Sequence, residues 1–141
     1  MANKRILLVE DNEDNSKLVR FLLERAGYEI IEARTGQQGI DLASAEKPDM
    51  ILMDLSLPEV DGYTAVRELK ADPHTTNIPT YALTAHNLPG DRSRALESGF
   101  DGYLSKPINV HSFASAIAEC LKAYKKPEEK WRNDGGSQST I

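Results

Sequence analysis

The stretch "DMILMDLSLPEVDG", residues 49–62, joins an apolar run to a proline-containing turn, with one carboxylate between them. The run "MILM" is uninterrupted, as expected of a parallel strand that is buried on both faces. Asp54 follows this run directly. Asp54 is therefore either the polar end of a strand or the reacting group of a site, and residues elsewhere in the chain must distinguish the two.

The composition indicates one globular domain of ordinary size, because the 141 residues are 40% hydrophobic and 28% charged. A net charge of −5 argues against a basic surface that binds nucleic acid. The longest apolar runs are far shorter than the ~20 residues needed to cross a bilayer. The N-terminal "MANKR" lacks the apolar core of a signal peptide, and the single cysteine, Cys120, suits a reducing compartment. We expect a cytoplasmic protein without membrane insertion.

Short apolar runs alternate along the chain with segments of helical length. The expected strands are residues 5–9, 28–33, 49–53, 79–84 and 101–105. The expected helices are residues 15–26, a segment opened by a capping box at 35–38 and limited by Pro48, and residues 63–71, 88–98 and 109–123. This alternation predicts an α/β fold with a five-stranded parallel sheet, right-handed crossovers and helices on both faces.

Two segments depart from the regular pattern. The helix expected at 88–98 has few apolar residues, so it is either a loosely packed surface helix or an element able to shift. Residues 125–141 are charged and then rich in Gly and Ser, which predicts a disordered tail. Trp131 is interpreted as an ordinary residue of this tail, with a docking anchor as the alternative.

Polar residues follow four of the expected strands. In open α/β sheets, ligands bind beyond the carboxyl ends of the strands. Glu10 and Asp11 follow the first strand, and Asp54, Thr84 and Lys106 follow the third, fourth and fifth. Each residue alone is more simply a solvated loop residue, a helix cap or a β-former. Their joint occurrence predicts one cluster at this edge of the sheet.

The residue types in this cluster suit phosphoryl transfer. Neighbouring carboxylates repel one another unless a cation neutralises them, and an all-oxygen ligand set suits Mg²⁺. A carboxylate can act as a nucleophile and form an aspartyl phosphate, which a metal, an ammonium and a hydroxyl would stabilise. A cis bond between Lys106 and Pro107 would aim the ammonium into the pocket.

Four blocks of the sequence together resemble a known family. They are "ILLVEDN", "DMILMDLSLPEVDG", "ALTA" and "GYLSKPI", and they resemble the receiver domain of bacterial two-component response regulators over about residues 4–123. The likeness is strongest to stand-alone receivers of the cell-division-control and chemotaxis type. The resemblance implies a doubly wound, flavodoxin-like (βα)5 fold with strand order 2-1-3-4-5. It places the receiver domain at residues 1–124.

The resemblance also implies the chemistry of the acidic residues. Asp54 would be the phospho-acceptor, taking a phosphoryl group from a histidine kinase or a histidine phosphotransfer protein. Asp11, Asp54 and the backbone carbonyl of Ser56 would bind Mg²⁺ (or Mn²⁺) directly. Glu10 stands where many members have Asp, and its longer side chain would still reach the ion through a metal-bound water.

Further residues match positions that act after phosphoryl transfer in this family. Lys106 would pair with the phosphoryl oxygens, and Thr84 would move to hydrogen-bond them. Tyr103 would be an aromatic switch that rotates inward on activation. Pro58 and Gly62 would shape the loop behind the acceptor.

The histidines carry less information about the site. His86, like Ser56, occupies a position that tunes dephosphorylation in the family, so the lifetime of the phosphoryl group is left open. His74 and His111 match no functional position and are expected on the surface.

The resulting hypothesis is a phosphorylation-activated signalling switch rather than an enzyme with a substrate of its own. Its output would be protein–protein contact through the face formed by the fourth helix, the fifth strand and the fifth helix. We expect no DNA-binding or enzymatic output domain after residue 124. The chain would be a monomer or a phosphorylation-dependent dimer.

Alternatives remain at the level of the sequence. The chain could be a receiver module of a hybrid kinase or larger regulator, or a receiver-like scaffold that is never phosphorylated. A haloacid-dehalogenase-type phosphatase also uses an Asp nucleophile and Mg²⁺, but it usually carries a second Asp where this chain has Ser56. Flavin binding is disfavoured, because no Ser/Thr/Gly-rich phosphate loop follows the first strand.

Overall fold

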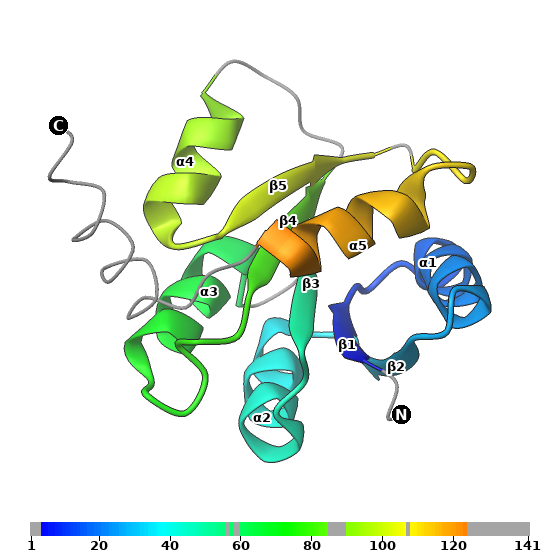
Figure 1. The fold of residues 1–141 in the computed structure, drawn as a ribbon. Coiled ribbons are helices and arrows are strands. Elements are labelled where there is room, and N and C mark those ends of the chain that lie inside the picture. Colours follow the sequence, from blue (N-terminus) through cyan, green and yellow to red (C-terminus); the bar gives the residue numbers. More distant parts are fainter. Residues whose placement is uncertain (1–3, 56, 58–59, 85–89, 107, 124–141) are drawn as a thin grey trace, which may run out of the picture.

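The computed structural model describes residues 4–55, 57, 60–84, 90–106 and 108–123 (Figure 1). Within these residues five strands alternate with five helices along the chain. The strands are β1 (Arg5–Val9), β2 (Glu29–Ala33), β3 (Met50–Asp54), β4 (Thr80–Thr84) and β5 (Gly102–Ser105). The helices are α1 (Glu13–Arg25), α2 (Gly36–Glu46), α3 (Gly62–Ala71), α4 (Asp91–Ser98) and α5 (Phe113–Ala123).

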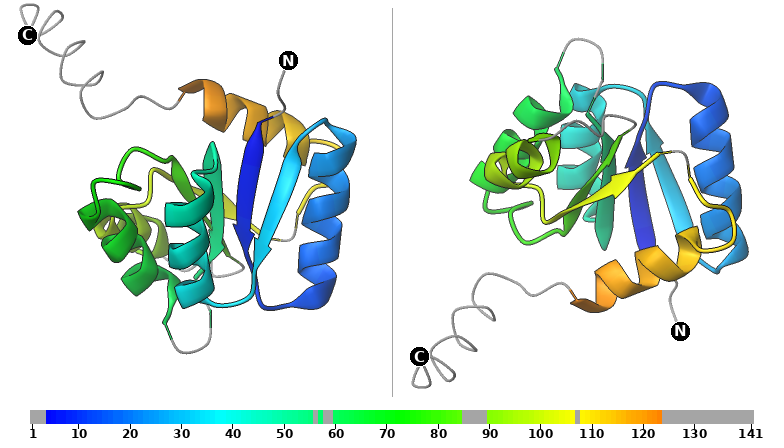
Figure 2. Two further views of the ribbon diagram at one scale, coloured as in Figure 1. Left: turned by 90° about the horizontal axis from the view of Figure 1, so that it is seen from below. Right: turned by 90° about the horizontal axis from the view of Figure 1, so that it is seen from above.

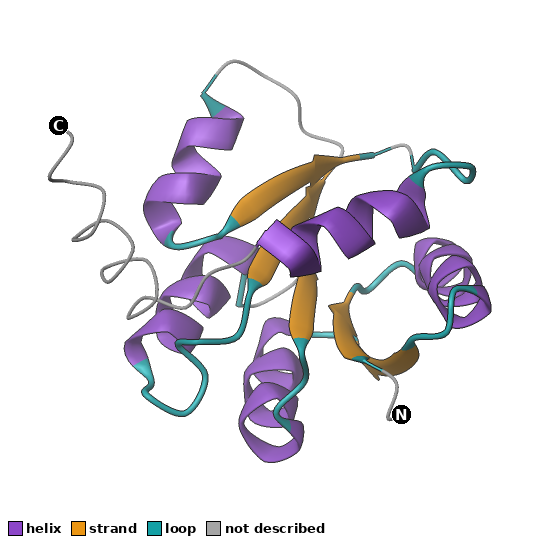
Figure 3. Ribbon diagram, viewed as in Figure 1, coloured by secondary structure: helices purple, strands orange, loops and turns teal. Residues whose placement is uncertain are grey.

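The strands form one parallel sheet in the order β2-β1-β3-β4-β5, which confirms the predicted flavodoxin-like topology. Figure 3 shows the sheet as the central layer between helices. Val9 pairs with Met53, and Asp54 pairs with Leu83. Because the strands are parallel and in this register, β1, β3 and β4 end at the same edge of the sheet.

Helices cover both faces of the sheet and bury two apolar layers. Helices α1 and α5 lie on one face, and α2, α3 and α4 lie on the other (Figure 2). All five residues of β3 are buried, as the uninterrupted apolar run predicted. Side chains alternate between faces along a strand, so Met50 and Leu52 pack toward α1 and α5, whereas Ile51 and Met53 pack toward the other helices.

Side-chain caps begin three of the helices. Asn12, Thr35 and Asp61 each accept a hydrogen bond from the backbone N–H three residues later, which satisfies an otherwise unpaired donor of the first turn. The capping box predicted at 35–38 is present with one change. The Gln38 side chain accepts from the backbone N–H of Arg34, one residue before the cap.

The predicted start of the fifth helix was wrong by four residues. Helix α5 begins at Phe113, and the preceding residues form a turn. The Asn109 side chain accepts a hydrogen bond from the backbone N–H of His111 at 3.0 Å, which offers the chain a local alternative to the helix. Val110 therefore lies 49% exposed instead of on the buried face of the helix.

Several predictions concern residues outside the described part of the chain. These residues are Ser56, Pro58, His86, Pro107 and the tail from 125 to 141 with Trp131. Among the described residues, no helix is long and apolar enough to span a membrane.

Candidate functional site

Three carboxylates meet at the carboxyl edge of the sheet. Asp54 is the last residue of β3, while Glu10 and Asp11 follow β1, the neighbouring strand. One carboxylate oxygen from each of the three residues lies within 4.8 Å of those of the other two. Glu10 and Asp54 are buried, and Asp11 is exposed. The structure thus brings together the acidic residues that the sequence placed on two separate strand ends.

Lys106 supplies the positive charge of this cluster. Its backbone N–H donates to the carbonyl of Thr84 at 2.8 Å, which anchors the lysine at the end of β5 beside β4. The ammonium nitrogen lies 2.8 Å from Glu10 Oε1 and 3.5 Å from Asp54 Oδ2. The Lys106 side chain is only 12% exposed, so little water screens these two ion pairs.

Glu10 is the most deeply buried of the three acidic residues, at 1% exposure. Burial raises its pKa above the ordinary value of 4.5, because desolvation disfavours the charged form, and the adjacent Asp54 acts in the same direction. The hydrogen bond from Lys106 partly offsets this rise in the pKa of Glu10. The backbone N–H of Asn12 also donates to Glu10 Oε2 at 3.2 Å. The site therefore concentrates negative charge that only one ammonium balances among the described residues.

The start of α3 lies directly against the acidic strand end. The Gly62 backbone N–H donates to the carbonyl of Leu55 at 3.3 Å. A Cβ atom at Gly62 would lie 2.7 Å from the Asp54 carbonyl oxygen and 2.9 Å from the Leu55 Cα. The close approach of two backbone segments explains why glycine occupies this position.

Thr84 and Tyr103 lie on the same face of the sheet. Thr84 ends β4 and is buried, and it pairs with Ser105 on β5. Ala82 and its partner Tyr103 both pack toward α3 and α4, and alternation along β4 puts Thr84 on that face as well. Thr84 and Tyr103 thus face the α3 and α4 side of the sheet, and Thr84 lies at the strand end next to β3.

The direct pairing of Glu10 with Lys106 was not anticipated from the sequence. From the sequence, Glu10 was expected to contact a metal-bound water and Lys106 the phosphoryl group. The position of Lys106 at a strand end indicated that it lies near the acidic residues. Whether it pairs more closely with Glu10 or with Asp54 depends on side-chain geometry, which the sequence does not give. His74 and His111 are exposed, as predicted.

The donor set fits a hard divalent cation. Carboxylate oxygens are the preferred protein ligands of Mg²⁺, and the three carboxylates together keep a net negative charge after the Lys106 ammonium balances one of them. Burial, and after it the neighbouring Asp54, raises the pKa of Glu10, and a bound cation would oppose this rise.

Comparison with known proteins agrees with this geometry. The model of the response regulator receiver domain family matches residues 6–118. The polar-differentiation response regulator DivK of Brucella anthropi is 45% identical over 118 residues, which cover 84% of this chain and 96% of the relative. DivK of Brucella ovis shows the same identity and coverage.

Solved structures of the same family share the fold. A response regulator from Chloroflexus aurantiacus has a TM-score of 0.81 at 26% identity, covering 86% of this chain and 99% of that one. The receiver domain of a sensor histidine kinase from Pseudomonas aeruginosa has a TM-score of 0.79 at 36% identity, covering 86% of this chain and all of that one. Its active-site cleft holds a coordinated magnesium ion. The chain therefore belongs to the response regulator receiver domain family of two-component systems.

Proposed function

We propose that this protein is a phosphorylation-activated signalling switch whose acceptor is Asp54. The observation that carries the proposal is the position of the Asp54 carboxylate, next to two further carboxylates and 3.5 Å from the Lys106 ammonium. The donor would be a phosphohistidine on a histidine kinase or a histidine phosphotransfer protein. An Asp54 oxygen would attack the phosphorus, forming an O–P bond while the N–P bond breaks and the imidazole leaves.

The charged residues of the site would bind and orient the transferring group. Lys106 would contact its oxygens, exchanging part of its present pairing with Glu10 for the new negative charge. The Thr84 hydroxyl would then hydrogen-bond the phosphoryl oxygens. These roles are supported by the placement of both residues at strand ends next to β3.

Mg²⁺ (or Mn²⁺) is the cofactor that the donor set supports. Asp11 and Asp54 would bind it directly together with the backbone carbonyl of Ser56, which lies outside the described residues. Glu10 would act through a metal-bound water. When bound, the ion would neutralise charge on the phosphoryl group.

The conformational output would pass from Thr84 through Tyr103 to the face formed by α4, β5 and α5. Leu96, on α4, is 43% exposed and offers an apolar contact for a protein partner. The protein would accept and lose a phosphoryl group without turning over a substrate of its own. It would act in the cytoplasm as a monomer or as a phosphorylation-dependent dimer, with residues 1–124 as the functional domain.

A receiver module of a larger kinase or regulator is the second candidate. The similarity to the receiver domain of a sensor histidine kinase supports it. The match covers 96% of the length of the DivK relative, so that relative consists almost entirely of this domain. Membership of the receiver family disfavours the phosphatase and flavin-binding alternatives, since those activities belong to other families.

The proposal is tested by incubating the full chain with Mg²⁺ and acetyl phosphate and measuring intact mass. We expect a gain of one phosphoryl group in the wild type, none in Asp54→Ala, and a wild-type gain in Asp72→Asn, which changes a carboxylate remote from the site. A gain in Asp54→Ala as well would refute the assignment of the acceptor. Phosphotransfer from each histidine kinase of the source cell would then identify the upstream partner.

A further inference from the structure

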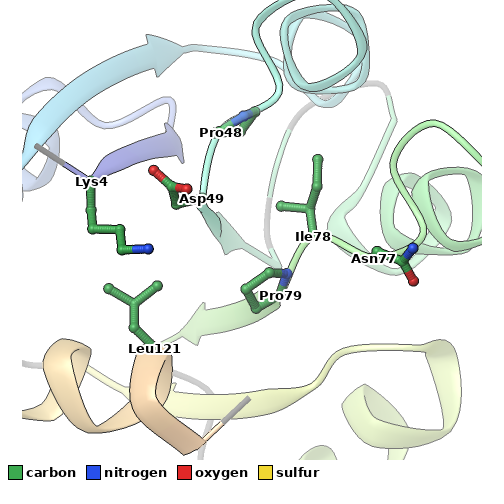
Figure 4. A pocket seen from close by; sticks show the side chains of 7 residues that line it. All are labelled: Lys4, Pro48, Asp49, Asn77, Ile78, Pro79 and Leu121. Carbon is green, nitrogen blue, oxygen red and sulfur yellow. The ribbon is translucent and has the colours of Figure 1, made fainter. Parts of the chain in front are cut away.

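An open hollow lies at the edge of the sheet opposite Asp54. Lys4, Asp49 and Pro79 directly precede β1, β3 and β4, so they mark the amino edge of the sheet. With Leu121 of α5 they surround an open hollow of about 440 Å³ (Figure 4). This volume falls in the ~300–1,000 Å³ range of ordinary ligand sites. The proposed phosphorylation chemistry does not use this hollow.

The hollow combines apolar walls with two opposite charges. Pro48 and Pro79 contribute rings, and Leu121 contributes an aliphatic side chain, as Figure 4 shows. The Lys4 ammonium and the Asp49 carboxylate stand at its border. Among the described residues, no carboxylate lies within ion-pair distance of Lys4. A fitting occupant is therefore a large apolar group flanked by charges of both signs.

The chain itself contains such a group ten residues after Leu121 in the sequence. Helix α5 ends at Ala123, two residues after Leu121. The segment "EEKWR", residues 128–132, places the sole tryptophan of the protein, Trp131, between acidic and basic residues. The eight residues from Ala123 to Trp131 span up to about 26 Å when extended, which allows the chain to turn back to the hollow.

We propose that Trp131 docks into this hollow in the same chain. The indole would cover Pro79 and Leu121, burying a large part of its apolar surface. The acidic pair before Trp131 would face Lys4, and the basic residues on either side of the indole would face Asp49. Closing this loop costs conformational entropy, and that cost grows only slowly with loop length. One buried aromatic residue and two exposed ion pairs would offset much of this entropic cost. The docking-anchor interpretation of Trp131 is thereby favoured over that of an ordinary tail residue.

A second hollow serves as the internal control for this proposal. It lies between α1 and the turn before α5 and is lined by Phe21, Val110 and Ala114, among others. The lining includes Arg25 and His111 but no carboxylate, so it offers no acidic partner for the basic residues beside Trp131. It also lies at the opposite end of α5 from Leu121, since Ala114 is in the first turn of that helix.

The fluorescence of the sole tryptophan measures docking directly in the full chain. We expect Trp131 emission in the native protein to be blue-shifted and less quenched by acrylamide than in the urea-unfolded protein. Emission and quenching equal to those of the unfolded chain would overturn the proposal. The blue shift should not change on dilution, because docking is intramolecular. A shift that disappears on dilution would assign the hollow to a second copy and overturn docking within one chain.

Substitutions locate the docking site. Leu121→Lys should return the emission toward the unfolded value, whereas Val110→Lys should leave it blue-shifted. Leu121→Ala, with a smaller effect expected in the same direction, replaces the lysine variant if circular dichroism shows that the latter is unfolded. A blue shift that survives both Leu121 substitutions, or one that Val110→Lys removes, contradicts the assignment to this hollow.

Discussion

The Lys106 ammonium donates a 2.8 Å hydrogen bond to the buried carboxylate of Glu10. The distance from the same ammonium to Asp54 is longer, at 3.5 Å. Glutamate at position 10 therefore has the length to pair with the lysine across the acidic cluster. Without a metal, this ion pair is the main compensation for the buried Glu10 charge among the described residues.

Removal of Lys106 should destabilise the metal-free protein. Lys106→Met leaves Glu10 buried without its ionic partner, and breaking a buried pair from one side costs on the order of 3 kcal/mol. Urea unfolding in the presence of a chelator measures the loss. Lys17→Met, which changes an exposed lysine of α1, should alter the free energy of unfolding little. Equal stabilities of the two variants would show that the pair contributes nothing.

The stability of the metal-free protein should depend on the protonation of Glu10. Its pKa is raised in the folded state, so between 4.5 and that higher value the folded protein binds more protons than the unfolded chain. The free energy of unfolding should therefore fall as the pH rises through this window and increase again as the pH is lowered toward 4.5. Glu10→Gln should lack this contribution, while Glu68→Gln, on the exposed side of α3, should retain it. Unfolding curves at several pH values test the difference, and identical profiles for wild type and Glu10→Gln would contradict it.

Gly62→Ala should disturb the strand end that carries the acceptor. The added Cβ would lie 2.7 Å from the Asp54 carbonyl oxygen, so one of the two backbone segments must move. We expect a loss of about 1–3 kcal/mol in stability and slower phosphorylation by acetyl phosphate. Thr64→Ala, an exposed change in the same helix, is the control. If Gly62→Ala has the stability and the phosphorylation rate of the wild type, the backbone accommodates the added Cβ without disturbing the Asp54 strand end.

Helix α4 should be held in place partly by a contact between Arg94 and Tyr63. The Arg94 guanidinium lies 4.1 Å from the centroid of the Tyr63 ring, which joins α4 to α3. Arg94→Ala should cost about 0.5–1 kcal/mol and increase hydrogen exchange in α4. Arg92→Ala, in the same helix, should do neither.

The same pair of variants separates the two interpretations of α4. If α4 shifts on activation, Arg94→Ala should also change the extent of phosphorylation at a fixed acetyl phosphate concentration, because the variant alters the balance of conformers. An unchanged extent alongside increased exchange would favour a surface helix without a switching role. Of the buried residues of α4, Ala95 is the apolar one, which agrees with the weak apolar pattern of its sequence.

The sequence by itself was enough to predict the fold class and the meeting of Glu10, Asp11, Asp54 and Lys106 at one edge of the sheet. Apolar runs at 5–9 and 49–53 are local patterns that report burial on both faces, and alternation with helices leaves few topologies. The carboxyl ends of parallel strands share one edge, so Glu10, Asp54 and Lys106 had to lie near one another. The family resemblance, carried by four separate blocks, was confirmed by the match over residues 6–118.

The tertiary structure decided what depends on distances between segments remote in the chain. Lys106 and Glu10 are 96 residues apart in the sequence. Lys106 lies closer to Glu10 than to Asp54, and this depends on side-chain length and burial in the folded protein. The late start of α5 coincides with the hydrogen bond that the Asn109 side chain accepts from the backbone N–H of His111, a local competitor of the helix that apolar periodicity does not report. The hollow beside Leu121 arises where three strand starts meet the end of a helix, and no local pattern in the sequence records that meeting.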